Sequence, residues 1–121
     1  APGEWLHFEE WIREVARTWH PSGIIGSGGN INKTHKLLEK KSRECIHAKE
    51  LNALYNRLRA MSVAQRMEQL YLNQSRAEVI VPALRIITDV LCICQIDTIL
   101  VPRMGLADGI IHELYRQYHL L

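Results

Sequence analysis

A short apolar run that turns through glycines directly into a helical pattern is the feature that most constrains this chain. Ile24 and Ile25 are followed by Gly26-Ser27-Gly28-Gly29-Asn30, and helical spacing begins near Ile31. Such a turn leaves backbone N–H groups free at the start of a helix, where phosphate groups bind readily. A purely structural turn from a strand to a helix also needs glycine, because glycine adopts positive φ without strain. Both interpretations remain open from the motif alone.

Composition allows one globular core and excludes some classes of partner. The chain has 121 residues, of which 47% are hydrophobic and 23% charged, and a net charge of +2. This charge is too small for a typical nucleic-acid-binding surface. The chain has one cluster of basic residues, whose spacing is typical of the solvated face of a helix that ends near residue 41. The cluster consists of Lys33, Lys36, Lys40, Lys41 and Arg43. With no secretion signal and no membrane span in the sequence, we expect a cytoplasmic protein that binds neither nucleic acid nor membrane.

The residue types that often carry chemistry do not form a recognisable site. Cys92 and Cys94 lie in an apolar helical run, and with Cys45 they are expected to be reduced thiols that act as small core residues. No histidine has the helical spacing and nearby carboxylate of a zinc hydrolase; the six are His7, His20, His35, His47, His112 and His119. Ser27 lacks the Gly-x-Ser-x-Gly elbow of serine hydrolases. We therefore expect no catalytic residue and no metal site in this chain.

Hydrophobic spacing predicts a mostly helical chain. The expected helices cover residues 4–18, 31–40, 48–61, 62–70 and 76–95, and a last amphipathic helix runs through Tyr118. Ser62 and Gln65 have the spacing of a capping box. The segment 76–95 is apolar nearly all round and predicts a buried central helix, with Pro82 near its first turns or at a kink. This apolar character argues against a helix-turn-helix motif over residues 65–85.

Two short strands complete the expected fold, at residues 22–26 and 98–101, whereas residues 42–46 are expected to form a connection. The order of helices and strands indicates an α/β class that is predominantly helical, with about two short parallel strands. Each strand precedes a glycine-bearing transition, at residues 26–32 and 104–109, and parallel strands end at one edge of a sheet, where α/β folds bind ligands. An anionic ligand there would meet N–H groups of Ser27, Gly28, Gly29 and Asn30, and a side chain of Asn32 or Lys33.

Four motifs follow one another between Ile24 and the C-terminus. They are Gly26-Ser27-Gly28-Gly29-Asn30-Ile31, Leu51-Asn52-Ala53-Leu54-Tyr55 with Met61-Ser62-Val63, Arg76-Ala77-Glu78-Val79-Ile80-Val81-Pro82-Ala83-Leu84, and Ile99-Leu100-Val101 with Gly105-Leu106-Ala107-Asp108-Gly109-Ile110-Ile111. In this order they resemble the exopolyphosphatase/guanosine pentaphosphate phosphatase family. The resemblance implies a partial ribonuclease-H-like domain of the actin and hexokinase superfold, in which two such domains close over a phosphate-bearing ligand.

The same resemblance implies how the chain relates to a longer protein. Residues 1–121 would be a single fragment, the C-terminal portion of the second of two domains. The start Ala1-Pro2-Gly3, without methionine, separately leads us to expect that residues 1–3 are an expression remnant. The catalytic glutamate and phosphate loops of the family lie upstream, so we expect the fragment alone to hydrolyse nothing. The parent would cleave phosphoanhydride bonds in polyphosphate or guanosine pentaphosphate with a divalent cation such as Mg²⁺. Members often carry lysine or arginine at the position of Asn32, and Lys33 stands beside it here.

A different class of function fits the same helices. The chain would then be a non-catalytic helical module for protein interaction, and its glycine turns would be structural. In either case the strands have unpaired edges and the helices have apolar faces, which predict a homo-oligomer.

Overall fold

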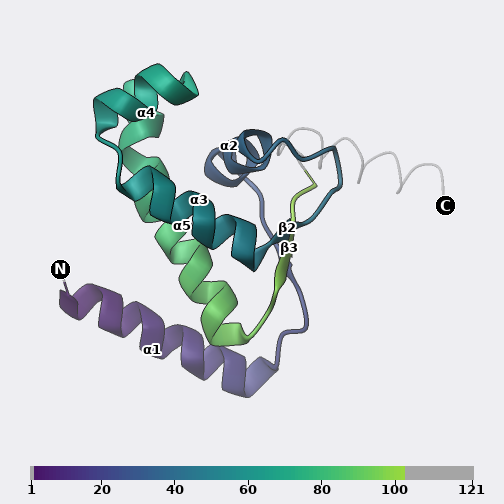
Figure 1. The fold of residues 1–121 in the computed structure, drawn as a ribbon. Coiled ribbons are helices and arrows are strands. Elements are labelled where there is room, and N and C mark those ends of the chain that lie inside the picture. Colours follow the sequence, from purple (N-terminus) through teal and green to yellow (C-terminus); the bar gives the residue numbers. More distant parts are fainter. Residues whose placement is uncertain (1, 103–121) are drawn as a thin grey trace, which may run out of the picture.

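The computed structural model describes residues 2–102. In this part of the chain five helices and three strands occur in the order α1 (Pro2–Trp19), β1 (Ile24–Ile25), α2 (Gly29–Leu37), β2 (Ile46–His47), α3 (Ala48–Arg59), α4 (Val63–Leu70), α5 (Gln74–Cys94) and β3 (Thr98–Leu100). Figure 1 shows α5 through the middle, with α3 beside it, α4 near one end and α1 near the other. The sheet and α2 lie together on the remaining side.

A small mixed sheet joins segments that are far apart in the sequence. Its strand order is β1-β3-β2, with β1 and β3 parallel. Ile24 lies opposite Ile99, and Ile25 lies opposite Leu100, so the two strands end side by side. The expected pair of parallel strands is therefore confirmed. The residues that follow each strand leave the sheet at the same edge, because parallel strands run in the same direction.

The third strand, β2, was not expected from the sequence. Ile46 pairs antiparallel with Ile99 and is fully buried, whereas the sequence places it in a connection. A strand of two residues is too short to show the alternation that identifies strands. His47 ends the strand and is also the N-cap of α3, so strand and helix meet without a turn residue between them. The prediction of a plain connection over residues 42–46 is wrong for this reason.

Helix α5 contacts all four of the other helices described. Its buried side chains are Ala77, Ile80, Leu84 and Leu91, and they join Leu51, Leu54 and Leu58 of α3 in one core. The expected central helix is confirmed, but it is not buried all round because Val79 and Ile86 are exposed. Pro82 lies inside α5 and is also exposed.

Local side-chain hydrogen bonds fix where two helices begin. The backbone N–H of Gln65 donates to the Ser62 hydroxyl at 3.1 Å, and the N–H of Ser62 donates to the Gln65 side chain at 2.8 Å. The capping box predicted for α4 is thus confirmed. Asn73 caps α5 in the same way, because its side chain accepts from the N–H of Arg76 at 2.8 Å.

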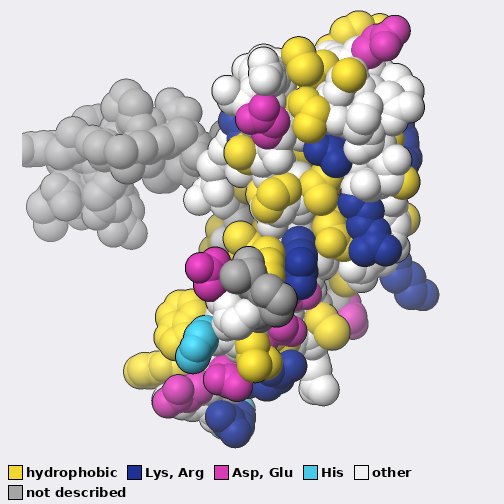
Figure 2. Space-filling model, turned by 90° about the vertical axis from the view of Figure 1, so that its left-hand side faces the viewer, with side chains coloured by type: hydrophobic (Ala, Val, Ile, Leu, Met, Phe, Trp, Pro, Cys, Tyr) yellow, Lys and Arg dark blue, Asp and Glu magenta, His cyan; other side chains and the backbone are white. Residues whose placement is uncertain are grey.

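Helix α1 packs against α5 through a mixture of apolar and charged contacts. Ile12 is buried, and the Arg85 guanidinium of α5 lies 4.0 Å from the ring centroid of Trp5. Burial and the neighbouring Glu9 raise the pKa of Asp89, while Arg85 and Arg13 oppose this shift. Trp11 and Trp19 remain 60% and 76% exposed. Figure 2 shows hydrophobic side chains reaching the surface among charged ones on the face that includes α1.

Some expectations concern residues that the structure does not describe. The second glycine-bearing transition, at residues 104–109, and the last helix through Tyr118 lie outside residues 2–102. Of the helices described, none has both the length and the hydropathy that crossing a bilayer requires.

Arg66 of α4 is a buried cation that ties three helices together. Only 9% of the residue is exposed. Its Nε donates to the carbonyl of Leu58 in α3 at 2.9 Å, and its Nη1 donates to the carbonyl of Ala77 in α5 at 2.8 Å. Charge-assisted hydrogen bonds of this kind are stronger than neutral ones, and removing the donor from a buried carbonyl destabilises the folded state.

We predict that Arg66→Met lowers the free energy of unfolding by about 2–4 kcal/mol, because methionine keeps the apolar stem but leaves both carbonyls without this donor. Urea denaturation of the variant measures this loss. Gln69→Met, at an exposed position of the same helix, is the matched control and should change stability by less than about 0.5 kcal/mol. Equal effects of the two substitutions would show that Arg66 does not hold the helices together.

Candidate functional site

The candidate site is the turn between β1 and α2, and close packing determines its first residue. The N–H of Gly26 donates to the carbonyl of Leu100 at 2.8 Å and so extends the pairing of β1 with β3. A Cβ at Gly26 would lie 2.8 Å from Cδ1 of Ile99 and 3.0 Å from Cγ1 of Ile31. Glycine suits this position because the backbone approaches two core side chains closely, and a larger residue would force them to shift.

Gly28 gives the turn its shape. Its φ of 106° and ψ of 174° lie in a region that only glycine adopts readily. Gly28 is the N-cap of α2, and its carbonyl accepts from the N–H of Asn32 at 3.0 Å. In the part of the chain that the structure describes, no side chain caps this helix. The first turn of α2 contains no acidic residue. The N–H groups at this helix start thus carry the positive end of the helix dipole, and no capping side chain among residues 2–102 balances it.

Arg76 adds a second source of positive charge at the same place. This residue belongs to the first turn of α5, and its Nη1 donates to Oδ1 of Asn30. Its guanidinium lies so close to Gly29 that a Cβ there would overlap it. A guanidinium beside the positive end of a helix is electrostatically unfavourable unless an anion lies near both. Sequence reasoning did not identify Arg76 as a site residue, because it is distant from the turn in the sequence and no local pattern marks it.

The other predicted residues occupy different environments. Ser27 is exposed and borders a hollow of about 310 Å³, whose walls are otherwise mainly apolar and include Ile25 and Ile87. Asn32 and Lys33 are partly buried, and Oδ1 of Asn32 is buried without a hydrogen-bond partner among the described residues. The structure thus brings Gly28, Gly29 and Asn30 together with Arg76, whereas the buried oxygen of Asn32 does not suit contact with an anion.

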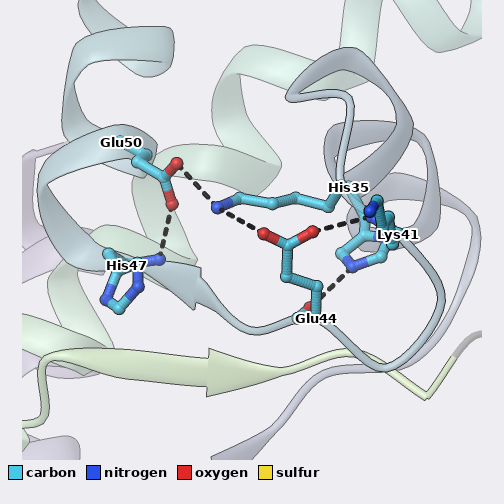
Figure 3. Close-up of polar contacts among 6 residues, drawn as sticks. His35, Lys41, Glu44, His47 and Glu50 are labelled. Carbon is cyan, nitrogen blue, oxygen red and sulfur yellow. Dashed lines mark hydrogen bonds and ion pairs between the residues drawn. The ribbon is translucent and has the colours of Figure 1, made fainter.

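A cluster of charged side chains holds the loop that follows α2, and Figure 3 shows this cluster. The Lys40 Nζ lies 2.8 Å from Oε1 of Glu50 and 3.6 Å from Oε2 of Glu44. Glu44 also accepts from the N–H of Lys41 at 2.9 Å, and Glu50 accepts from the N–H of His47 at 3.0 Å. The cluster joins the loop after α2 to the start of α3.

The cluster corrects the expectation of a solvated basic face that continues to residue 41. Helix α2 ends at Leu37, and the Lys40 side chain is only 10% exposed. The hydrogen bond to Glu50 is the main cause that raises the pKa of Lys40, and the same bond is the main cause that lowers the pKa of Glu50. The pKa of Glu44 is lowered chiefly by the N–H of Lys41.

The described histidines and cysteines form no metal centre. Residues 2–102 contain no group of three or more His, Cys, Asp or Glu side chains placed to hold an ion. His35 is fully buried, and its Nε2 donates to the carbonyl of Glu44 at 2.7 Å, which is a structural role. The three cysteines are free thiols, as the sequence predicts, but Cys92 is exposed and is therefore not a core residue.

Sequence comparison and structure comparison give different results for this chain. No protein-family model matches the sequence, and no curated protein is significantly similar to it. A Ppx/GppA family member from Aquifex aeolicus matches the structure with a TM-score of 0.76 and 21% identity, covering 98% of this chain and 43% of that one. An exopolyphosphatase from Cytophaga hutchinsonii matches with a TM-score of 0.76 and 19% identity, covering 97% of this chain and 43% of that one.

The type II variant of the Aquifex aeolicus Ppx/GppA phosphatase gives a similar result, with a TM-score of 0.74 and 20% identity over 93% of this chain and 41% of that one. At sequence identities this low, the comparison shows that the folds are similar and nothing further. The chain has a partial Ppx/GppA-like, actin-like fold, and it spans less than half the length of these solved structures. The fold class expected from the sequence resemblance is thereby confirmed.

We predict that Gly28→Ala lowers the free energy of unfolding by about 1–3 kcal/mol, because alanine is strained at this φ and ψ. Thermal or urea unfolding measures the change. Gly23→Ala is the control: a Cβ there meets nothing within 4 Å and φ is not positive, so stability should stay equal or rise by up to about 1 kcal/mol. A neutral Gly28→Ala would contradict the described turn.

The ion cluster predicts a loss of stability in acid. Because the pKa of Glu50 is lower in the folded state, its contribution is present above the unfolded pKa and is lost as pH falls through the folded pKa. Between about pH 6 and about pH 3, the Glu50→Gln variant should therefore lose less stability than the wild type. Urea midpoints across this range measure the difference. Glu68→Gln, at an exposed position of α4, should follow the wild type, and a Glu50→Gln curve parallel to the wild type would exclude the effect.

Proposed function

We propose that this chain is the C-terminal portion of the second domain of a phosphohydrolase of the Ppx/GppA type, and that the parent cleaves phosphoanhydride bonds in polyphosphate or guanosine pentaphosphate. Two findings support the proposal. Nearly the whole chain matches such proteins in fold, among them an exopolyphosphatase. The turn after β1 also combines an uncapped helix start with the Arg76 guanidinium.

The helix start with Arg76 is the observation that carries the proposal. Backbone N–H groups from Ser27 to Asn30 and the guanidinium would bind oxygens of a phosphate group. Fixed donors of this kind stabilise the negative charge that develops on phosphoryl oxygens when water attacks the phosphorus. In this proposal Lys33 is an additional cation near the same edge. These residues bind and orient the phosphate group, and none of them activates the water.

The resemblance also implies a divalent cation in the parent, which would polarise the phosphoryl group. Residues 2–102 gather no group of side chains that fits such an ion. In our proposal the catalytic residues belong to other parts of the parent, which is a cytoplasmic enzyme, and the 121-residue chain alone releases no phosphate from polyphosphate.

Self-association is part of the proposal. Among the described strands β1 lies at an edge of the sheet, and its Ile25 is 71% exposed. An unpaired edge with an apolar side chain favours pairing with another chain. We therefore propose a homo-oligomer for the isolated chain, and size-exclusion chromatography that gives a monomer would contradict it.

A non-catalytic interaction module is the alternative function. The exposed Trp11 and Trp19 of α1 favour it, because aromatic side chains are enriched at protein interfaces. In that case the glycine turn would be structural and phosphate compounds would not bind there.

The test uses the full-length parent. Polyphosphate in large excess should raise its melting temperature by several degrees, because a ligand at about 100 times its Kd stabilises by about 2.7 kcal/mol. Gly29→Val, whose side chain would displace Arg76, and Arg76→Gln should both reduce this rise. Arg57→Gln removes the same charge from an exposed position of α3 and should leave the rise unchanged.

Two results would contradict the proposal. No rise in the wild-type parent with either polyphosphate or a guanosine polyphosphate would favour the interaction module. A rise that all three variants retain would mean that the ligand binds away from the glycine turn.

A further inference from the structure

The two faces of the small sheet differ in how they are covered. Ile46 and Ile99 are buried and Ile24 is partly buried, and these side chains belong to the core that α5 shares with α3. Successive side chains of a strand point to opposite faces of the sheet. Ile25 and Leu100, which lie opposite each other in the register, therefore point away from this core, and they are 71% and 38% exposed.

The face that carries Ile25 and Leu100, called the outward face below, has no helix over it in the part of the chain from residue 2 to residue 102. Figure 1 shows the labelled helices, α1 to α5, to the left of β3. Parallel strands usually occur in sheets that are covered on both faces, because both faces carry apolar side chains. A second layer is therefore expected over the outward face.

The chain leaves the sheet from its central strand. Strand β3 lies between β1 and β2, and residues 103–121 follow it after Val101 and Pro102. The sequence of residues 109–121 has the spacing of an amphipathic helix. Its apolar side would consist of Ile110, Ile111, Leu114, Tyr115, Tyr118 and Leu121, and its polar side of His112, Glu113, Arg116, Gln117 and His119.

We propose that residues 109–121 form a helix whose apolar side packs on the outward face, over Ile25 and Leu100. A helix of this length is about 20 Å long, which is enough to cross the short strands of the sheet. Residues 103–108 leave a connection of the length that is usual between a strand and a helix. The sheet then has a helical layer on each face.

A second copy of the chain is the competing occupant of the outward face. Ile25 and Leu100 form only a small apolar patch, whereas a stable interface buries about 800 Å² on each partner. The segment after β3 is attached beside the patch, and a short tether gives an effective concentration on the order of millimolar. A patch of this size therefore favours the attached helix over a free partner.

This proposal is independent of the proposed function, because neither the glycine turn nor Arg76 takes part in it. It also leaves the hydrogen-bonding edge of β1 open, since a helix over the face of a sheet does not pair with the backbone of an edge strand. Self-association through that edge and packing of the helix on the face are thus separate events.

Hydrogen exchange of the complete 121-residue chain, followed by mass spectrometry, tests the proposal. Amides of residues 112–118 should exchange at least about tenfold more slowly than in an unfolded peptide, because so short a helix is stable only when it is packed. The double variant Ile25→Thr with Leu100→Thr should remove this protection and leave that of α5, since threonine suits a strand but offers less apolar surface. Val79→Thr, at an exposed position of α5, is the matched control and should change neither.

A second pair of variants tests the helix itself. Leu114→Gln changes the apolar side and should abolish the protection of residues 112–118, whereas Glu113→Gln changes the polar side and should retain it. Fast exchange of this segment in the wild type would overturn the proposal, and so would protection that the double variant keeps. Protection that disappears when the protein is diluted about a hundredfold would overturn it too, because a second copy would then cover the face.

Discussion

Parallel pairing of β1 with β3 is the contact on which the positions of the other elements depend. It joins residues 24–25 to residues 99–100, which are far apart in the sequence. The local contacts that form the helices do not bring these two segments together. The core-facing row of this sheet consists of the buried Ile46 and Ile99 and the partly buried Ile24, and it packs on the core that α5 shares with α3. Because both strands point the same way, the glycine turn lies at one edge and the ends of α1 and α5 lie at the other.

At the first of these edges, three short-range constraints act together. Gly26 lets the backbone pass close to Ile99, Gly28 turns the chain, and Gly29 leaves room for the Arg76 guanidinium. The result is positive charge from a side chain beside positive charge from a helix start. Such an arrangement costs free energy in the absence of an anion and lowers the free energy of a bound phosphate group. In our proposal this positive charge serves to bind a phosphate group, in addition to the close packing that the glycines allow.

Features set by neighbours in the sequence were predictable. The capping box of Ser62 and Gln65 is one, because its hydrogen bonds join residues three apart. The parallel strands were predictable from apolar runs that each precede glycine. Features set by distant residues were not predictable: β2 forms because Ile46 pairs with Ile99, and the largely covered Lys40 side chain pairs with Glu50. The contact of Arg76 with Asn30 belongs to the same group, since it joins residues 46 positions apart.

The part of the site that follows β3 lies outside the described residues, so the convergence of two glycine turns remains a prediction. Phosphate binding at the turn after β1, which lies within the described residues, can be tested directly. The decisive measurement is a crystal structure of the full-length parent with a non-hydrolysable polyphosphate analogue. We expect phosphate oxygens within hydrogen-bond distance of the N–H groups at Gly28–Asn30 and of the Arg76 guanidinium. An analogue bound elsewhere, with Arg76 in contact only with Asn30, would contradict it.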